Sequence, residues 1–290
     1  MTSPPAAGRT VPTRRISFEE SLEGLPKHFA VDGDLILSHL AVSLSSVFPD
    51  GEEFFVRSVR AFRDQVTDPD LKRQVAGFIG QETVHGREHR ALNERLDQLG
   101  YPAQHFERVT RRALAIRERV ATKKSNLAAT AGLEHFTAVL AEMIMGDEEV
   151  RDLFGDPAVR DLFLWHALEE SEHKAVAFDV YKAVGGSERT RVLTMKLVRF
   201  GFVSGLALQI VISLLGDRAT YRPGNLRQSW HRFRRSPLAR RELWDQLRDY
   251  DRPDFHPDDR DTDGLLEHWR TELFGDDGTL NDKLVTRAVA

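Results

Sequence analysis

The chain has 290 residues, enough to bury a substantial core in one large domain or in one domain with an appendage. Charged residues make up 30% of it and the formal net charge is −4, a balance that gives no reason to expect a nucleic-acid partner. It contains no cysteine, which excludes disulfides, zinc–thiolate sites, iron–sulfur clusters and thiol nucleophiles. Any metal ion must therefore be held by His, Asp and Glu side chains, which suit iron, manganese or zinc.

The N-terminal segment lacks the features of a secretory signal. Residues 1–15 are rich in Pro, Thr and Arg and have no apolar core. We therefore expect a cytoplasmic protein in which residues 1–24 form a disordered arm.

Helical periodicity dominates the chain from there to about residue 250, and no run alternates with period two for long enough to indicate a sheet. Pro49-Asp50-Gly51 is expected to separate the first two helices, with Asp50 capping the second. Residues 25–250 thus form one helical domain, and residues 251–290, which begin with many Pro and Asp residues, form an extended tail packed on it. The candidate helices span residues 34–47, 51–67, 69–99, 106–121, 125–150, 157–184, 188–215 and 225–250.

Polar residues interrupt an apolar stripe in the middle of the third helix. Steps of three and four residues select mostly Leu, Val and Phe, which is the inward-facing pattern of a bundle helix. Glu82, His85 and His89 occupy the centre of this stripe. At about 100° per residue, these three side chains fall within about 60° of one another.

The sixth helix repeats the pattern. His166, Glu170 and His173 occupy the centre of its apolar stripe. Two helices therefore each place a Glu and a His three residues apart on a core-facing surface.

The second and fifth helices each add one carboxylate. Glu52 begins the apolar stripe of the second helix, whereas the frame through Glu53 meets arginines. Glu134 lies in the stripe of the fifth helix among small residues, which leave room beside its carboxylate.

Four carboxylates buried together require cations, because uncompensated buried charge costs several kcal/mol per ion. One Glu from each of two helices and Glu-x-x-His from two others is the ligand arrangement of di-iron and di-manganese bundles. We therefore predict a site for two metal ions, with iron expected and manganese or zinc as alternatives. The predicted ligands are Glu52, Glu82, His85, Glu134, Glu170 and His173, with His166 as a further one.

His89 has three open roles: a metal ligand, a hydrogen-bond partner of a ligand, or a catalytic base on the substrate side. We take the catalytic base as the working hypothesis. Glu53, Glu169 and Glu172 point away from the stripes and are expected to be solvated or to support the ligands, and His135 is expected to be structural. The Arg-rich run after residue 231 is expected to be a solvated helix face, and the Asp-rich run after residue 253 a surface loop.

Four segments resemble the bacterial family of predicted metal-dependent hydrolases, a ferritin-like group. They are FPDGEEFFVRSVR, FIGQETVHGREH, LEHFTA and WHALEESEHKAVAFDVY, and the resemblance extends over roughly residues 25–260. Together with the helical stripes, it predicts an all-α fold: a ferritin-like four-helix bundle with additional C-terminal helices.

A second resemblance is local. The spacing His166-x-x-x-Glu170-x-x-His173 is similar to the last-helix motif of di-iron arylamine N-oxygenases such as p-aminobenzoate N-oxygenase. That resemblance implies that an additional histidine joins the usual carboxylate–histidine ligands. His89 departs from the motif and leaves the ligand count open.

Three functions are compatible with this site. The preferred hypothesis is an O2-dependent di-iron oxygenase or oxidase that acts on a small or lipophilic organic substrate and needs an electron donor. A hydrolase that uses a metal-bridged water, with His89 as general base, would employ the same ligands. The third is a non-enzymatic iron-binding protein, although the long extension after residue 185 does not favour a storage shell.

Residues 201–215 (GFVSGLALQIVISLL) are almost wholly apolar. The segment is shorter than the roughly 20 residues that span a bilayer. We expect a buried helix or a homodimer face here, with peripheral contact to a membrane or to a long apolar substrate as the alternative.

Overall fold

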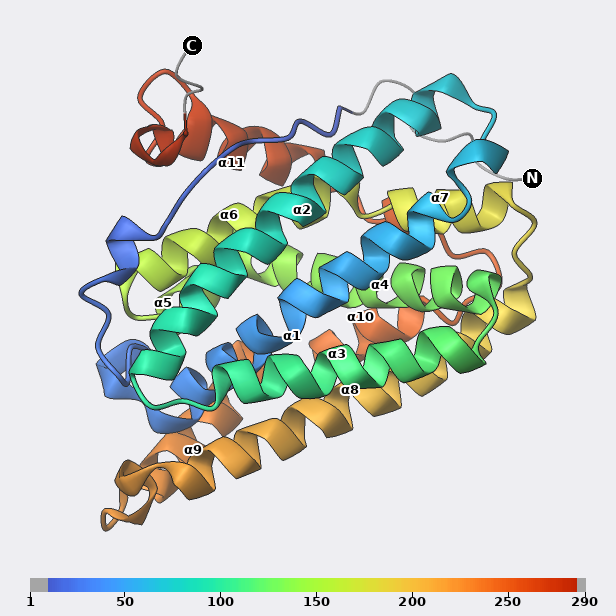
Figure 1. Ribbon diagram of the computed structural model, residues 1–290. Helices are drawn as coiled ribbons and strands as arrows, with labels where there is room; N and C mark the ends of the chain where they lie inside the picture. Colours follow the sequence, from blue (N-terminus) through green and yellow to red (C-terminus); the bar gives the residue numbers. More distant parts are fainter. Residues whose placement is uncertain (1–9, 286–290) are drawn as a thin grey trace.

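The computed structural model describes residues 10–285, and these form helices and connecting turns, with one isolated β-bridge between Ile16 and Leu284 (Figure 1). The all-α prediction is therefore confirmed for the described residues. The α-helices are α1 Leu35–Arg60, α2 Pro69–Gln98, α3 Ala103–Val120, α4 Lys123–Gly146, α5 Glu148–Asp152, α6 Pro157–His173, α7 Val176–Ala183, α8 Glu188–Gly216, α9 Asn225–Arg235, α10 Arg241–Asp249 and α11 Asp263–Phe274.

Side-chain caps fix where the long helices begin. The carboxylates of Asp34, Asp68 and Asp156 accept hydrogen bonds from the first-turn amides of α1, α2 and α6. Thr122 and Ser187 cap α4 and α8 in the same way through their hydroxyl oxygens. These caps satisfy amides that have no partner inside the helix. They also fix the residue at which each helix begins, and hence which side chains face the core.

Two hydrophobic cores lie on either side of a polar layer. Along α2, Phe78 belongs to one core, and Val84 and Leu92 belong to the other. Along α6 and α7, the change occurs between Leu168 and Val176. The two Glu-x-x-His segments fall at these boundaries, so the fold encloses their polar side chains between two apolar layers.

The helix α1 is continuous where two helices were expected. Pro49 lies inside it, and Asp50 is a helical residue and not an N-cap. A proline inside a helix leaves the carbonyl four residues earlier without its donor. Here the side-chain amide of Asn93 donates to the Ser45 carbonyl at 3.1 Å, which replaces the missing bond and allows α1 to run on to Glu52.

Three other boundaries differ from the prediction. The expected helix 157–184 bends after His173, where buried Lys174 donates to the carbonyl of Arg260, and continues as α7. The expected helix 225–250 is divided by Ser236-Pro237 into α9 and α10, because the proline ring starts a new turn. The expected extended tail instead contains α11, whose Leu266 and Leu273 are buried in one of the two cores.

The described part of the N-terminal arm is ordered against the bundle. Ile16, Phe18 and Leu22 are buried, in contrast to the expected disorder of residues 1–24, of which residues 1–9 lie outside the described residues. The segment crosses α2 at two glycines: a Cβ on Gly77 or Gly80 would overlap Val11 or Thr13. The apolar residues of this segment are irregularly spaced, so helical periodicity could not predict that it packs on the bundle.

The helix α8 lies along the outside of the molecule, on the side away from α11 (Figure 1). It packs on α4 and α1, but only Arg191, Thr194, Met195 and Ser213 of its residues are buried. The expectation that the segment 201–215 is a helix buried within the chain is therefore wrong, since Ser213 is its only buried residue.

Candidate metal centre

Four helices bring the seven predicted ligands into one buried cluster. Glu52 comes from α1, Glu82 and His85 from α2, Glu134 from α4, and the remaining three from α6. All seven are buried, with at most 3% of each residue exposed. The stripes chosen from the sequence therefore meet at one point in the fold.

The first of two groups contains Glu52, His85 and His166, whose candidate ligand atoms lie within 4.8 Å of one another. His166 Nε2 is 3.7 Å from Glu52 Oε1 and 2.9 Å from Glu170 Oε1. His85 Nδ1 is 3.4 Å from the same oxygen of Glu170.

The second group contains Glu82, Glu170 and His173. His173 Nε2 is 3.1 Å from Glu82 Oε1, 3.4 Å from Glu134 Oε2 and 3.6 Å from Glu170 Oε1. Glu170 therefore lies between the two groups.

Most polar atoms that face the centre of the cluster have no hydrogen-bond partner, whereas His166 Nε2 and Glu170 Oε1 lie 2.9 Å from each other. The unpaired atoms are both carboxylate oxygens of Glu52, Glu82 and Glu134, Oε2 of Glu170, Nδ1 of His85 and Nε2 of His173. Buried polar atoms are almost always paired, because an unpaired one costs about 1–3 kcal/mol. So many convergent unpaired acceptor atoms fit the ligand set of bound metal ions.

Neighbouring side chains fix which nitrogen of two histidines faces the centre. Glu169 Oε2 lies 3.0 Å from His85 Nε2 and can only accept, so it favours the proton on Nε2 and leaves Nδ1 as a lone pair. Gln81 Oε1 accepts in the same way from His173 Nδ1 at 2.8 Å, leaving Nε2 free. Such partners are what metal-ligating histidines usually have.

Arg14 connects the N-terminal segment to these supporting residues. Its guanidinium group is 2.8 Å from Glu169 and 2.8 Å from Glu172, and Arg270 of α11 also reaches Glu172 at 2.7 Å. Glu169 and Glu172 are fully buried, so the expectation that they support the ligands fits, and the alternative that they are solvated is wrong. Glu53 is half-exposed and pairs with Arg90 and Arg57 on the surface.

His89 lies behind His166. Its Nε2 is 2.6 Å from His166 Nδ1, and its Nδ1 is 2.9 Å from the Ser45 hydroxyl. Ser45 in turn donates to Asn93 Oδ1 at 2.7 Å. Both ring nitrogens of His89 are therefore engaged, which fits the role of a hydrogen-bond partner better than that of a free catalytic base.

The pKa values of the buried Glu and His side chains show that the cluster has more negative than positive charge. Burial raises the pKa of the Glu52 and Glu134 carboxyl groups well above their usual range, and the carboxylate of Glu82 raises both further. Burial alone would lower the pKa of His85 and His173, but the surrounding carboxylates raise both well above normal. Burial lowers the pKa of His166 to about 4, so its ring is neutral at pH 7.

Two apolar cavities reach the cluster. One of about 70 Å³ lies among α1, α4 and α6 and ends at His166 and Glu170. The other, of about 420 Å³, lies among α1, α3, α4 and α8 and includes Glu52 in its lining. Because their other lining residues are mainly Leu, Phe, Val and Ala, both favour an apolar ligand.

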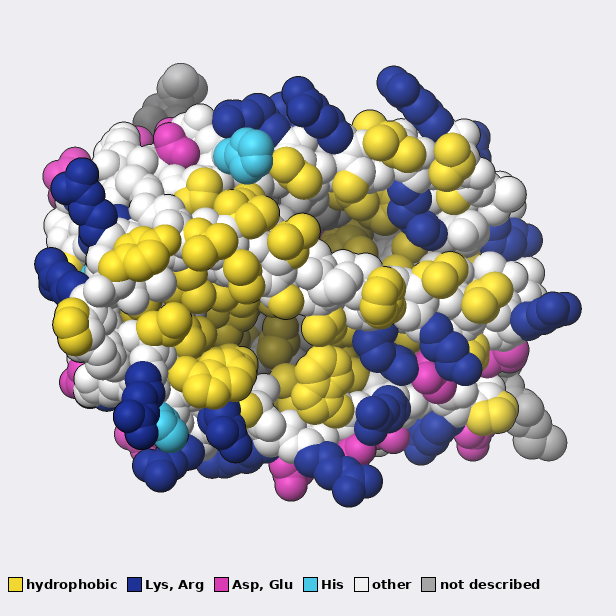
Figure 2. Space-filling view, turned by 90° about the horizontal axis from the view of Figure 1, so that it is seen from below, with side chains coloured by type: hydrophobic (Ala, Val, Ile, Leu, Met, Phe, Trp, Pro, Cys, Tyr) yellow, Lys and Arg dark blue, Asp and Glu magenta, His cyan; other side chains and the backbone are white. Residues whose placement is uncertain are grey.

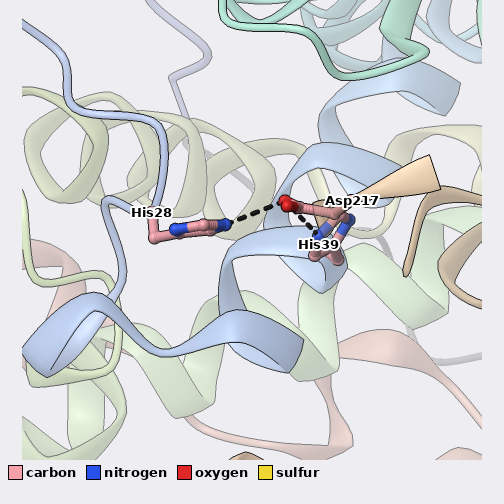
Figure 3. Close-up of side chains that lie close together, drawn as sticks. All are labelled: His28, His39 and Asp217. Atoms are coloured by element: carbon pink, nitrogen blue, oxygen red, sulfur yellow. Dashed lines mark hydrogen bonds and ion pairs between the residues drawn. The ribbon is translucent and has the colours of Figure 1, made fainter. Parts of the chain in front are cut away.

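A third group of possible ligands lies elsewhere: Asp217 at the end of α8 contacts both His28 and His39 (Figure 3). Asp217 Oδ2 is 2.8 Å from His28 Nε2 and 3.3 Å from His39 Nε2. Lys27 Nζ is also 3.3 Å away, so this carboxylate already has a cation beside it. The group joins α8 to α1 and to the N-terminal segment, and it lacks the unbalanced charge of the main cluster.

Four residues that support the cluster were not predicted from the sequence: Arg14, Gln81, Ser45 and Asn93. The separate His28–His39–Asp217 group was not predicted either. Apolar stripes identify residues that share one face of one helix, whereas these residues lie on other faces or in irregular segments. The one available signal was in α6, where polar residues are buried on every side from His166 to His173. His135 is buried and bonds the Gln246 carbonyl at 3.0 Å, in accord with a structural role.

Arg232 also departs from its predicted solvated face, since it pairs with Asp34, the buried cap of α1, at 3.1 Å. In the acidic tail, His256 pairs with Asp179 of α7 at 2.9 Å. Both contacts fasten the C-terminal part of the chain to the bundle.

A family model described as predicted metal-dependent hydrolase matches residues 12–261. No curated protein and no solved structure matches the chain.

Proposed function

The chain belongs to the family of predicted metal-dependent hydrolases, and on this basis we propose that its buried cluster holds two divalent metal ions and catalyses hydrolysis of a substrate with an apolar portion. The observation that carries the proposal is the convergence of unpaired carboxylate oxygens and imidazole nitrogens from four helices. Two divalent ions would balance the four glutamate charges, which protons alone would otherwise have to neutralise.

The two groups suggest how the ions would be shared. Glu52, His85 and His166 would hold one ion, and His173 with Glu82 and Glu134 the other. Glu170 lies between the groups and would contact both ions. When bound, a pair of such ions lowers the pKa of water and polarises a carbonyl or phosphoryl group.

The protein's own residues prepare the site. Glu169 and Gln81 hold two rings with the correct nitrogen inward. If His166 binds through Nε2, its Nδ1–H donates to His89, and His89 then donates to Ser45, whose hydroxyl donates to Asn93. Every donor in this series finds an acceptor, so we propose that His89 positions His166 and does not act on the substrate.

The substrate would be an ester or phosphoester that carries an apolar chain. The larger cavity has room for such a chain, since about 420 Å³ lies within the range of small-molecule sites. Its lining offers few polar groups, among them Glu52, Arg117 and Gln209.

A second candidate function is that of an O2-dependent oxygenase or oxidase with a ferritin-like bundle and iron in the site. The specific observation in its favour is the ligand set: single glutamates on α1 and α4, and Glu-x-x-His on α2 and α6, as in di-iron and di-manganese bundles. The additional His166 is in accord with the resemblance to arylamine N-oxygenases. Such an enzyme would require an electron donor.

One experiment separates these functions. The full chain is purified anaerobically, loaded in parallel with Zn²⁺, Mn²⁺ or Fe²⁺, and assayed against p-nitrophenyl esters and phosphoesters of increasing chain length. Oxygen uptake is measured beside it with a chemical reductant. Metal-dependent hydrolysis that is absent in Glu52→Gln and present in Glu53→Gln is expected. Oxygen uptake by the iron form without hydrolysis would favour the second candidate, and metal binding without either activity would favour a non-enzymatic iron-binding protein.

A further inference from the structure

The exposed apolar side chains of the described residues gather on one face. Every large hydrophobic residue that is strongly exposed lies on α3, on α8, on α9 or in the short turn between α8 and α9, with Val285 as the exception. We call this surface the apolar face. Its members are Val109, Ile116, Val120, Leu193, Leu197, Phe200, Leu208, Val211, Ile212, Leu215, Tyr221, Leu226 and Trp230.

Figure 2 shows this face directly. Hydrophobic side chains gather over its middle, where the surface is hollowed, and Lys and Arg side chains stand around its edge. Soluble monomers rarely expose contiguous apolar patches of more than a few hundred Å², and larger patches mark interaction sites. We therefore expect another molecule or a membrane to cover the apolar face.

The helix α8 is apolar enough to be considered as a membrane span, as is α4, which is mostly buried in the protein. However, α8 packs lengthwise on α4 and α1, and its Arg191 is fully buried under α10 and the residues that follow it. These features fit a helix that lies in the plane of a membrane surface better than one that crosses it.

The charges on the same helices fit an anionic surface. Arg112 and Arg119 lie one helical turn from Ile116 on α3, and Arg227 and Arg234 lie one turn from Trp230 on α9. All four are exposed, and none forms an ion pair with another described residue. The helix α9 contains four arginines and no acidic residue. Basic residues around a hydrophobic face are the pattern of proteins that bind anionic lipid headgroups.

The larger cavity provides a link between this face and the metal cluster. Exposed Val109 and Leu197 are in its lining, as is buried Glu52. Gly201 and Gly205 line it from α8, and a Cβ on either would meet no atom within 4 Å. An apolar molecule held at the face can therefore enter the cavity without crossing water.

We infer that the apolar face docks on the surface of an anionic lipid bilayer, with the mouth of the cavity against the lipid. A second copy of the chain is the competing occupant, but it would offer these arginines little negative charge: α9 has no acidic residue, and Glu107, Glu118 and Glu188 of α3 and α8 are already bonded within their own chain. Lipid headgroups neutralise those arginines instead. Docking depends on the surface alone and does not rest on the reaction proposed for the metal cluster.

Vesicle flotation with the metal-loaded full chain tests the inference. We expect the protein to float with vesicles of phosphatidylcholine and phosphatidylglycerol, and to float less with phosphatidylcholine alone or in high salt. Phe200→Gln/Leu208→Gln/Leu215→Gln should reduce binding at least about tenfold, because each change removes an exposed apolar side chain. These residues are 77%, 61% and 61% exposed, so the fold should tolerate the changes.

Two controls complete the design. Val285→Gln alters an exposed apolar residue outside the face and should bind like the unaltered protein. Arg227→Gln/Arg234→Gln should weaken binding to anionic vesicles and reduce its salt dependence. Absence of flotation with both kinds of vesicle would overturn the inference. So would a stable dimer in light scattering that the triple variant converts to monomers, since a second copy would then cover the face.

Discussion

At the scale of single residues, two features define the cluster. One is the set of Glu and His residues present, and the other is that neighbouring side chains leave particular nitrogen and oxygen atoms of these residues unpaired. Glu169 and Gln81 each occupy one nitrogen of a histidine. The other nitrogen lies near two carboxylates in His85 and near three in His173. His166 differs, because its outer nitrogen contacts another imidazole, that of His89. Each of the three rings thus has a partner that sets its orientation.

His89→Ala tests the positioning role. We expect the variant to retain its fold and to bind metal about 10–100-fold more weakly, because His166 loses the partner that orients it. Competition with a chelator of known affinity measures the change. His135→Ala removes a buried histidine outside the cluster and should leave the affinity unchanged. An unaltered affinity in His89→Ala combined with loss of turnover would instead restore the catalytic role.

The sequence predicted the inward-facing ligands because burial on a helix is periodic. Glu52 rather than Glu53 could be selected from the stripe alone, and the structure buries the first and half-exposes the second. Partners such as Gln81 and Arg14 could not be predicted, because nothing in a single helix shows what packs across from it.

At the scale of elements, the continuity of α1 depends on a neighbour. The Asn93 amide on α2 replaces the hydrogen bond lost at Pro49 and also accepts from the Ser45 hydroxyl. Local sequence at Pro49-Asp50-Gly51 favours a break, and only this contact between helices reverses it. The break at Lys174 was missed for the same reason, because it involves a contact with Arg260 far along the chain. The break at Ser236-Pro237 is local and follows from the proline.

Asn93→Ala should therefore destabilise the protein by about 3 kcal/mol, because it leaves the Ser45 carbonyl and hydroxyl buried with fewer partners. Urea unfolding measures the difference. Asn126→Ala is the control: Asn126 is also buried, but its side-chain oxygen has no partner to lose. Equal destabilisation of the two variants would contradict the role assigned to Asn93.

The N-terminal segment contributes to the centre through Arg14. Removing its guanidinium leaves Glu169 without that cation and Glu172 with Arg270 alone. We expect Arg14→Ala to lose about 3–5 kcal/mol of stability, as when one partner of a buried ion pair is removed. It should also weaken metal binding, because Glu169 orients His85. Arg15→Ala, one residue away and exposed, should behave like the unaltered protein in thermal unfolding and metal titration. Identical results for both variants would refute the contribution of Arg14.

At the scale of the whole molecule, the polar cluster lies between two hydrophobic cores and is closed by segments from both ends of the chain. The fold thus keeps water away from a group of charges that only cations can balance. The bundle helices could be predicted from periodicity, whereas the closure by the N-terminal segment and α11 could not, because it depends on contacts between residues far apart in the chain.

The affinity of the cluster for metal ions should depend on pH. Burial raises the pKa of Glu52 and Glu134, so in the metal-free protein these carboxyl groups take up protons at pH values where ordinary glutamates are ionised. Metal binding must displace those protons, so affinity should rise with pH and fall on acidification, by about tenfold per pH unit for each proton released. Metal titrations from pH 5.5 to 7.5 (a range of about two units around the usual His pKa) check this. An affinity independent of pH would show that the carboxylates are already ionised.

The most direct test of the central claim is the metal content of the protein purified anaerobically, compared between the unaltered chain, Glu52→Gln and Glu53→Gln. The two substitutions affect adjacent residues of α1, one inside the cluster and one on the surface. We predict about two metal ions per chain in the unaltered protein and in Glu53→Gln, and loss of at least one in Glu52→Gln. A protein that stays without metal even after reconstitution, or a Glu52→Gln variant with full occupancy, would contradict the dinuclear centre.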